Sequence, residues 1–173
     1  MSPRPLDLPF DPIERAGELW ADRFGPAAAM RAATSIMRAQ QLLIARFDAT
    51  LKPHGLTFAR YEALVLLHFS RAGVLPLSVI GERLMVHPTS VTNTIDRLVA
   101  QELVERRPNP RDGRGVLAAI TPAGRKVVAR ATDDLMRDGF GLSAYDEQQL
   151  GELFGLLRVI RVDAGDFAVE EAP

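Results

Sequence analysis

The stretch from Leu75 to Thr121 constrains this 173-residue chain most, because it contains a short helix with an unusual exposed face. The helix is predicted to begin at Pro88, whose fixed φ and missing N–H suit a first helical turn, and to end near Gln101. Its apolar residues follow the spacing i, i+4, i+7 and predict one buried stripe: Val91, Ile95 and Leu98. The other positions carry short hydroxyls, one carboxamide and one guanidinium instead of the long Glu and Lys side chains of an ordinary surface helix. Such a face suits close contact with the floor of a DNA major groove.

The segment before this helix completes a helix-turn-helix. Residues 77–84 predict a second short helix with Ile80 and Leu84 facing inward. Gly81 presents no side chain there, so another helix can cross at close range. A tight turn over residues 85–87 joins the two helices, which is the arrangement of a helix-turn-helix.

Two apolar-containing strands follow the central helix. They are predicted over residues 103–107 and 116–120, and they flank a loop of Pro, Asn, Asp, Gly and Arg that is typical of a hairpin. The loop contains one acid, Asp112, and four arginines stand in it or at its base: Arg106, Arg107, Arg111 and Arg114. A cationic hairpin tip can reach a minor groove while the helix fills the major groove, so the whole stretch predicts a winged helix-turn-helix.

Several motifs in this stretch match a known family. The run from Val86 to Leu98 resembles the recognition helix of the MarR family of bacterial transcription regulators. Residues 103–106 followed by 112–114 resemble the family's Asp-x-Arg wing signature, and residues 120–124 resemble the end of its wing. The order of predicted elements is similar to the family from about residue 26 to residue 160. The resemblance implies a ligand-responsive repressor that binds a pseudo-palindromic operator in double-stranded DNA as a homodimer.

Two positions depart from the family pattern. Met85 stands where a glycine often occupies the turn of the helix-turn-helix. His87 replaces the usual hydroxyl or carboxamide N-cap of the recognition helix. On capping grounds, the second change predicts a helix start that is weaker by about 1 kcal/mol.

Long helices are predicted on both sides of the DNA-binding region. The first runs from Pro26 to about Lys52, and its apolar residues follow the 3-4 spacing of a helix that packs against another helix. A second apolar line, Ile36 and Leu43, widens this stripe, so we expect burial both by the domain and by a second subunit. The last helix also has an apolar face: Leu150, Leu153, Phe154, Leu157 and Ile160. Such terminal helices are typical of a dimerisation platform.

We therefore expect a mainly α fold with a small β-wing, in which a winged helix-turn-helix is flanked by N- and C-terminal dimerisation helices. The predicted segments are an N-terminal extension with a short helix (1–25), a dimerisation and core helix (26–56), the winged helix-turn-helix (57–121), C-terminal dimerisation helices (122–163) and an acidic tail (164–173).

Four local structures are predicted outside the central motif. Trp20, on a short helix that ends at Gly25, is expected in the core. Thr57 can cap the helix that follows it. Gly73 and Pro76 mark a loop before the helix-turn-helix. The run 143–146 is typical of a capping box with Ser143 as the N-cap of the last helix.

Composition excludes several classes of protein. There is no cysteine, so disulfides, zinc-thiolate sites and thiol oxidation sensors are excluded, and the three scattered histidines predict no metal site. No nucleophile elbow, P-loop or dinucleotide fingerprint is present, so we expect neither an enzyme nor a cofactor. No apolar run has the length of a membrane span and the first residues lack a signal-peptide core, so we expect a cytoplasmic protein with no membrane partner.

The net charge of −1 conceals an asymmetry along the chain. Residues 133–173 contain ten acids and three arginines, a net charge of −7, so residues 1–132 carry +6. A nearly neutral protein can still bind nucleic acid where its positive charge is local. The acidic end is then expected to lie away from DNA.

The residues predicted to contact DNA come from the helix and the wing. We expect groove and phosphate contacts from Thr89, Ser90, Thr92, Asn93 and Arg97, and wing contacts from Arg111 and Arg114. Ser90 and Thr92 also fit an ordinary solvated helix surface. Asp96 is expected to pair with an arginine. The resemblance implies that Asp112 orients a wing arginine, although an Asp-Gly pair also fits a simple turn.

The resemblance also implies a ligand site between the dimerisation helices and the DNA-binding region. Its candidate residues are Trp20, Arg23, His54, Tyr61, Glu62 and His68, and its candidate effector is a small aromatic or phenolic molecule. An alternative function, from another class, is a winged-helix module that binds protein without direct DNA readout. The arginines of the loop weigh against this alternative, because protein binding does not require a cationic tip.

Overall fold

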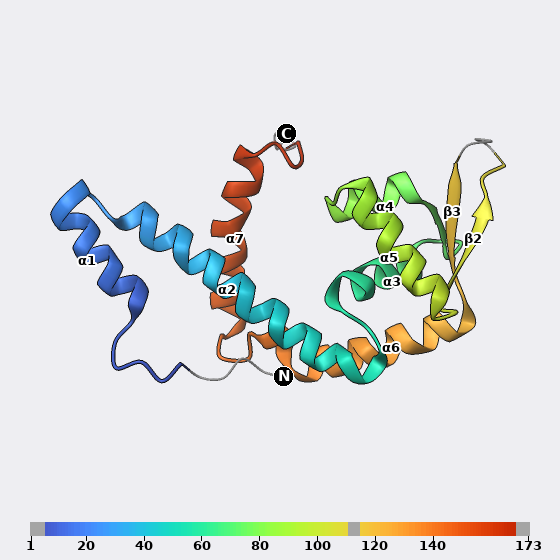
Figure 1. Cartoon of the computed structure of the whole chain (residues 1–173), viewed down its shortest axis with the longest axis horizontal. Helices are drawn as coiled ribbons and strands as arrows, with labels where there is room; N and C mark the ends of the chain where they lie inside the picture. Colours follow the sequence, from blue (N-terminus) through green and yellow to red (C-terminus); the bar gives the residue numbers. More distant parts are fainter. Residues whose placement is uncertain (1–5, 111–114, 169–173) are drawn as a thin grey trace. The chain divides into compact units, whose positions relative to one another are not determined.

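The computed structural model describes residues 6–110 and 115–168 of the chain. Helices dominate this part, and a small antiparallel sheet completes it, which confirms the predicted fold class (Figure 1). The elements are α1 (Pro12–Phe24), α2 (Ala28–Leu51), the 3-10 helix η1 (Lys52–His54), α3 (Phe58–Phe69), β1 (Val74–Pro76), α4 (Leu77–Leu84), α5 (Pro88–Ala100), β2 (Val104–Pro108), β3 (Val116–Ile120), α6 (Pro122–Arg137), the 3-10 helix η2 (Gly139–Gly141) and α7 (Glu147–Asp163).

The chain divides into two compact units, Met1–Gly141 and Leu142–Pro173. The first contains all elements from α1 to η2, and the second contains α7. Three consecutive residues with positive φ, Gly139, Phe140 and Gly141, end the first unit.

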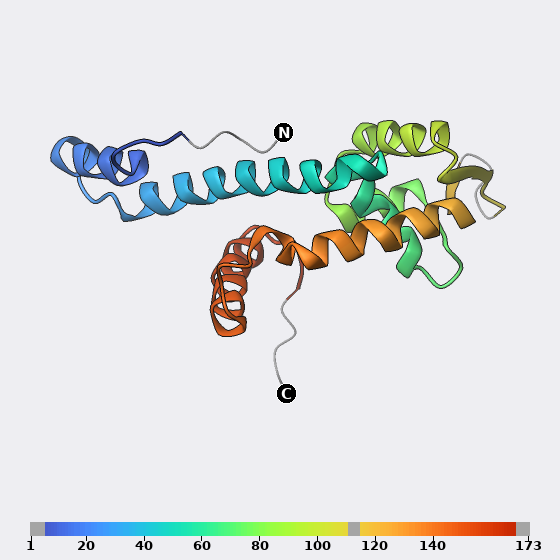
Figure 2. The ribbon, with the colours of Figure 1, turned by 90° about the horizontal axis from the view of Figure 1, so that it is seen from below.

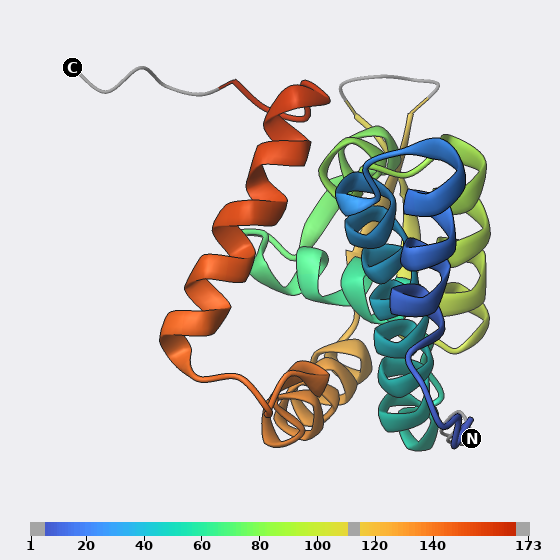
Figure 3. The same ribbon diagram turned by 90° about the vertical axis from the view of Figure 1, so that its left-hand side faces the viewer.

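Helix α1 folds back along the N-terminal part of α2 (Figure 3). Asp11 begins α1, because its Oδ1 accepts the backbone N–H of Ile13 at 2.8 Å, and Gly25 ends it with φ 102°. The prediction that Trp20 lies in the core is wrong for this chain: its side chain is 42% exposed and packs against the ring of Phe24. Helix α2 covers one side of α1, and the indole remains at the surface.

The core of the first unit lies where the C-terminal part of α2 meets α3, α5 and α6 (Figure 2). The predicted stripe of α5 is confirmed, since Val91, Ile95 and Leu98 are all buried. Helix α6 begins where predicted, with Thr121 Oγ1 accepting the N–H of Gly124 at 3.0 Å. The largest fully buried side chains around the stripe are Leu51, Leu64, Leu67, Ile80, Val104, Val128 and Leu135.

Two predicted helix caps differ from the structure. Thr57 occupies the N-cap position of α3, but the first N–H, that of Phe58, donates instead to Asp48 Oδ1 at 2.7 Å. The Thr57 hydroxyl accepts from Arg60 Nε at 3.2 Å. In the second unit, the capping box is formed by Asp146 and Gln149 and not by Ser143. The side-chain oxygen of Gln149 accepts the backbone N–H of Asp146 at 3.0 Å, and this second bond stabilises the later start.

The wing is part of a three-stranded antiparallel sheet in the order β1-β3-β2. Strand β3 pairs with β2 from Val104↔Ile120 to Pro108↔Val116 and with β1 from Val74↔Ala119 to Pro76↔Leu117. Strand β1 lies where the sequence predicted only a loop. A three-residue segment that contains a proline has no measurable alternation, and its extended shape depends on pairing with β3.

In the second unit, α7 has no buried side chain along its full described length. Leu150, Leu153 and Leu157 are half-buried, whereas Phe154 and Ile160 are exposed. After the helix, the ring of Phe167 lies 5.0 Å from the guanidinium carbon of Arg158.

No described helix has the length and apolar character that a membrane crossing requires. No cluster of His, Asp and Glu suited to a metal ion occurs among the residues 6–110 and 115–168.

Candidate nucleic-acid interface

The turn between α4 and α5 requires a left-handed residue, and Met85 supplies it. Met85 has φ 55° and ψ 40°, and the N–H of Val86 donates to the carbonyl of Gly81 at 3.1 Å, which closes the end of α4. The side chain of Met85 is exposed, so the turn keeps its geometry without the glycine that often stands there. A Cβ atom at Gly81 would lie 3.2 Å from Val91 Cγ2, which confirms the predicted close crossing of α4 and α5.

His87 caps the recognition helix α5, which corrects the expected weak start. Its Nδ1 accepts the backbone N–H of Thr89 at 3.2 Å. Nδ1 occupies the same position along the side chain as the Oδ1 of Asn or Asp, so a neutral imidazole with its proton on Nε2 can replace the usual cap. Pro88 follows as the first helical residue.

The predicted DNA-contacting residues of α5 lie together on its exposed side. All five are exposed: Thr89, Ser90, Thr92, Asn93 and Arg97. They surround the N-terminal and middle turns of a helix whose opposite side is buried in the core. After Pro88, the helix therefore presents short polar groups and one guanidinium to solvent over these turns.

An ion pair connects α5 to the wing. Asp96 Oδ1 lies 2.7 Å from Arg106 on β2, which confirms that Asp96 pairs with an arginine. Also on β2, the guanidinium of Arg107 pairs with the carboxylate of Glu105 at 3.1 Å. Both arginines at the base of the wing thus have acidic partners, so the positive charge of this surface depends on other residues.

The tip of the wing, with Arg111, Asp112 and Arg114, lies outside the described residues. The described residues on either side close the loop, because the N–H of Asn109 donates to the carbonyl of Gly115 at 3.1 Å. The roles of the three tip residues therefore stay predictions.

Arg60 is a candidate that sequence reasoning missed. It lies in the first turn of α3 and lines one groove together with Thr57, Asn93, Thr94 and Arg97. Arg60 and Arg97 are 37 positions apart in the sequence. Only the packing of α3 against α5 brings them to one groove, so no local pattern could have indicated it.

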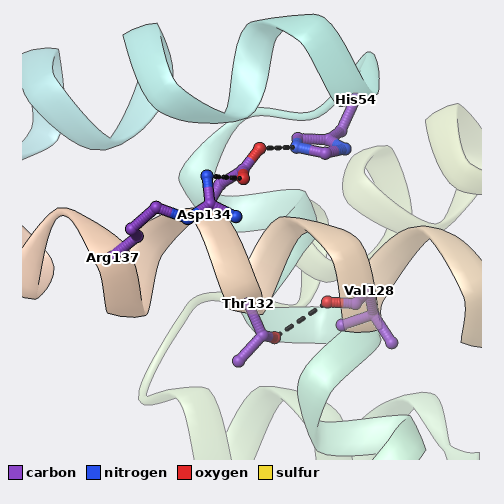
Figure 4. Close-up of polar contacts among 5 residues, drawn as sticks. All are labelled: His54, Val128, Thr132, Asp134 and Arg137. Atoms are coloured by element: carbon purple, nitrogen blue, oxygen red, sulfur yellow. Dashed lines mark hydrogen bonds and ion pairs between the residues drawn. The ribbon is translucent and has the colours of Figure 1, made fainter.

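Two of the six candidate effector residues already have partners on α6. His54 Nε2 lies 2.7 Å from Asp134 Oδ2, and Arg137 contacts the other oxygen of that carboxylate at 2.8 Å (Figure 4). The hydroxyl of Tyr61 lies 3.0 Å from that of Thr132. Because the Thr132 hydroxyl donates its hydrogen to the carbonyl of residue 128, Tyr61 is the donor in this pair.

The other four candidates have different surroundings. Glu62 lines a cavity of about 60 Å³ beneath α5, beside Ser90, and burial raises the pKa of its carboxyl group. Trp20 and Arg23 are on α1, and His68 is exposed beside Phe69 at the end of α3. The structure does not bring the six residues into one pocket.

A capped recognition helix, its close-packed partner α4 and a three-stranded wing define a winged helix-turn-helix protein. The comparisons with known proteins agree. A family model described as "MarR family" matches residues 54–115. Sco5413, a MarR family transcriptional regulator from Streptomyces coelicolor, is 64% identical, with a TM-score of 0.76, and the match covers 82% of this chain and 98% of Sco5413. The chain belongs to the MarR family of transcriptional regulators.

Two further relatives share less of the sequence. The uncharacterised HTH-type transcriptional regulator YhbI of Bacillus subtilis is 30% identical over 95 residues, which are 55% of this chain and 60% of YhbI. The chain spans 60% or less of the curated relatives it matches. Sco3205 of Streptomyces coelicolor, whose structure was solved in complex with DNA, is 23% identical with a TM-score of 0.71, over 82% of this chain and 93% of Sco3205, and it shows the fold alone. The family is a class of regulators without enzymatic activity, which confirms that expectation.

Proposed function

We propose that this chain is a cytoplasmic repressor that binds a pseudo-palindromic operator as a homodimer and releases it on binding a small ligand. The observation that carries the proposal is the exposed polar side of α5 over its fully buried stripe. Such a helix can bring donors and acceptors within hydrogen-bond distance of base edges in a major groove. The shared fold with Sco3205, which was solved in complex with DNA, supports DNA as the partner.

The polar residues of α5 take different roles in this proposal. Asn93 lies near the middle of the exposed side, and its carboxamide suits a bidentate contact with adenine. Arg97 lies one turn later, farther from the helix N-terminus, and binds a phosphate. Thr89, Ser90 and Thr92 complete the groove contact, and the wing arginines Arg111 and Arg114 reach the minor groove, with Asp112 orienting one of them.

Exposed apolar side chains support the homodimer. Met37 on α2 is 59% exposed and Phe154 on α7 is 60% exposed, and Ile44 and Ile160 are exposed as well. Large exposed apolar side chains on each of the two units are typical of a protein interface. Two recognition helices related by a two-fold axis then enter successive major grooves about 34–36 Å apart, so the operator has half-sites about one helical turn apart.

The proposal is tested by selection from DNA with randomised half-sites. Asn93→Ala is expected to relax the preference at one position of each half-site, whereas Arg97→Ala weakens all sequences alike. Lys126→Ala, an exposed charge on α6, is the control and is expected to leave the selected motif unchanged. An unchanged motif for Asn93→Ala together with an altered motif for Arg97→Ala would reverse the two roles.

A salt titration separates this function from a winged-helix module that binds only protein. A repressor that contacts phosphates loses affinity steeply as salt increases, because condensed counterions are released on binding. A protein-interaction module shows no specific binding to the selected DNA at any salt concentration.

Dimerisation and ligand response have their own tests. Deleting residues 143–173 is expected to give monomers or aggregates in light scattering, and a soluble truncated dimer would place the interface elsewhere. Ligand response rests on family membership. Among the described residues, the candidate contacts whose side chains have no hydrogen bond or ion pair are Trp20, Arg23, Glu62 and His68. A thermal-shift screen of aromatic acids and phenols, followed by DNA-release assays on each hit, tests it.

A further inference from the structure

We propose that Arg60 and Arg97 bind one backbone phosphate of DNA together, and that Gln101 is a positioning residue that holds Arg60 ready for this contact. The inference rests on the proposed DNA-binding function and adds to it a phosphate site that joins α3 to the recognition helix.

The first observation is the shared groove. Thr57 and Arg60, at the start of α3, form one side, and Asn93, Thr94 and Arg97 of α5 form the other. Asn93 is the residue proposed to contact a base, so this groove on the protein opens beside the surface of α5 that enters the major groove of DNA. A phosphate that flanks the base contacted by Asn93 can therefore reach both guanidinium groups.

The second observation is uncompensated charge. No carboxylate lies within ion-pair distance of Arg60 or Arg97 among the described residues, and the residues that line the groove include no acid. Other arginines of the described chain are in ion pairs: Arg15, Arg46, Arg106, Arg107 and Arg137. Of the acids nearest in sequence, Asp96 pairs with Arg106, and Glu62 lines the separate cavity beneath α5 beside Ser90. Two cations that line one groove without an acid attract an anion.

The third observation is the support of Arg60 by neutral groups. Its Nε donates to Thr57 Oγ1 at 3.2 Å, and its Nη1 donates to Gln101 Oε1 at 3.1 Å. Gln101 is itself held, because its Nε2 donates to the carbonyl of Gly55 at 2.8 Å. These contacts use two of the five guanidinium N–H groups and leave three for a ligand, while the charge stays unneutralised. A side chain held in place before binding loses less entropy when it binds.

A phosphate suits these donors better than a base does. Guanidinium groups bind the oxygens of a phosphate in a forked, charge-assisted geometry. Such hydrogen bonds are stronger than those between neutral groups, so loss of one guanidinium is expected to weaken DNA binding by about 10-fold at low salt.

The experiment measures the affinity of the full-length protein for its selected operator by fluorescence anisotropy over a series of KCl concentrations. For wild type, the logarithm of affinity falls linearly with the logarithm of salt concentration, and each neutralised phosphate makes this slope steeper by about 0.9. A reduced slope means a shallower one. Arg60→Ala and Arg97→Ala each reduce the slope. The double variant reduces it by about 0.9 in total, because both arginines serve one phosphate.

Gln101→Glu tests the positioning role. The substitution keeps the shape of the side chain but places a carboxylate against Arg60, so the slope falls as it does for Arg60→Ala. Arg60→Lys keeps the charge and loses the fork, so the slope stays near wild type while affinity falls. Arg71→Ala removes an equal charge from beyond the opposite end of α3 and is the matched control, with an unchanged slope expected.

Different outcomes overturn different claims. If wild type binds DNA with a steep salt dependence but Arg60→Ala and Gln101→Glu behave like Arg71→Ala, the phosphate site is wrong and the proposed function stands. If the double variant lowers the slope by about 1.8, the arginines contact two separate phosphates and the shared site is wrong. If inorganic phosphate stabilises wild type but not Arg60→Ala in thermal unfolding, and DNA affinity is equal, the site takes free phosphate and the DNA contact is refuted. Failure of wild type to bind DNA overturns the proposed function as well. Thermal unfolding of each variant without ligand confirms that it is folded.

Discussion

Replacing Gly124 by alanine is expected to destabilise this protein, although helix propensity alone predicts the opposite. Gly124 is the third residue of α6, and alanine in a helix interior is favoured over glycine by up to about 1 kcal/mol. The neighbouring backbone decides the outcome. A Cβ atom at position 124 would overlap the carbonyl oxygen of Leu103 and would lie 2.9 Å from Ile120 Cγ1.

The cost can be estimated from the groups that must move. The carbonyl of Leu103 accepts the N–H of Thr121 at 3.1 Å, and this bond joins the end of the α5–β2 turn to the start of α6. Moving the carbonyl puts at risk a hydrogen bond worth about 0.5–1.5 kcal/mol, and overpacking of the site costs about 1–3 kcal/mol more. After the propensity gain is subtracted, a net loss of about 2 kcal/mol remains, or roughly 4–8 °C in Tm for a chain of this size.

Urea and thermal unfolding of Gly124→Ala measure this loss. Ala129→Gly, at an exposed position on the same helix, is the control that measures propensity alone, with an expected loss of about 0.8–1 kcal/mol. A Gly124→Ala variant as stable as wild type, or more stable, would refute the argument, because it would mean that α6 can move away from the turn at no cost.

Three further predictions concern charged groups. Burial raises the pKa of Glu62, so its ionised form costs stability at neutral pH, and Glu62→Gln is expected to raise Tm at pH 7. A lower Tm would mean that the carboxylate makes a favourable contact. A double-mutant cycle on Asp96 and Arg106 is expected to give a coupling of about 0.2–1 kcal/mol in urea unfolding that shrinks with added salt, and a coupling that does not change with salt would count against an exposed ion pair. The hydrogen bond from Arg46 lowers the pKa of Asp138, so this interaction stabilises the fold fully above the ordinary aspartate pKa and is lost as pH falls through the lower pKa of the folded state. Asp138→Asn is expected to reduce the loss of stability at acid pH. An unchanged loss at acid pH would mean that other carboxylates cause it.

Periodic and terminal signals in the sequence predicted most helices correctly. Pro88 and Pro122 mark the first residues of α5 and α6, and the stripe of Val91, Ile95 and Leu98 is buried as its spacing indicated. Such signals work because they depend on local geometry. The helical period of 3.6 residues and the fixed φ of proline are properties of a few neighbouring residues.

Features that depend on distant residues were not predictable in this way. Strand β1 is extended because it pairs with β3, and the first N–H of α3 is satisfied by Asp48 from the preceding helix. In the candidate interface, too, one feature was predictable from local sequence and another was not. The exposed side of α5 follows from its own periodicity, whereas the approach of Arg60 to Arg97 depends on how α3 packs against α5.

The central position of β3 in the sheet has a consequence for how the protein is made. Strand β3 pairs with both other strands, yet it is the last of the three in the sequence. The segments β1, α4, α5 and β2 leave the ribosome before β3, which pairs with both β1 and β2. The apolar stripe of α5 is therefore outside the ribosome before the sheet beside it can form. Closing the loop from β1 to β3 also costs entropy that only the completed contacts offset. We therefore expect this region to fold in one late step once Ile120 has left the ribosome. Nascent chains that stop before β3 are expected to expose the stripe to chaperones or to aggregation.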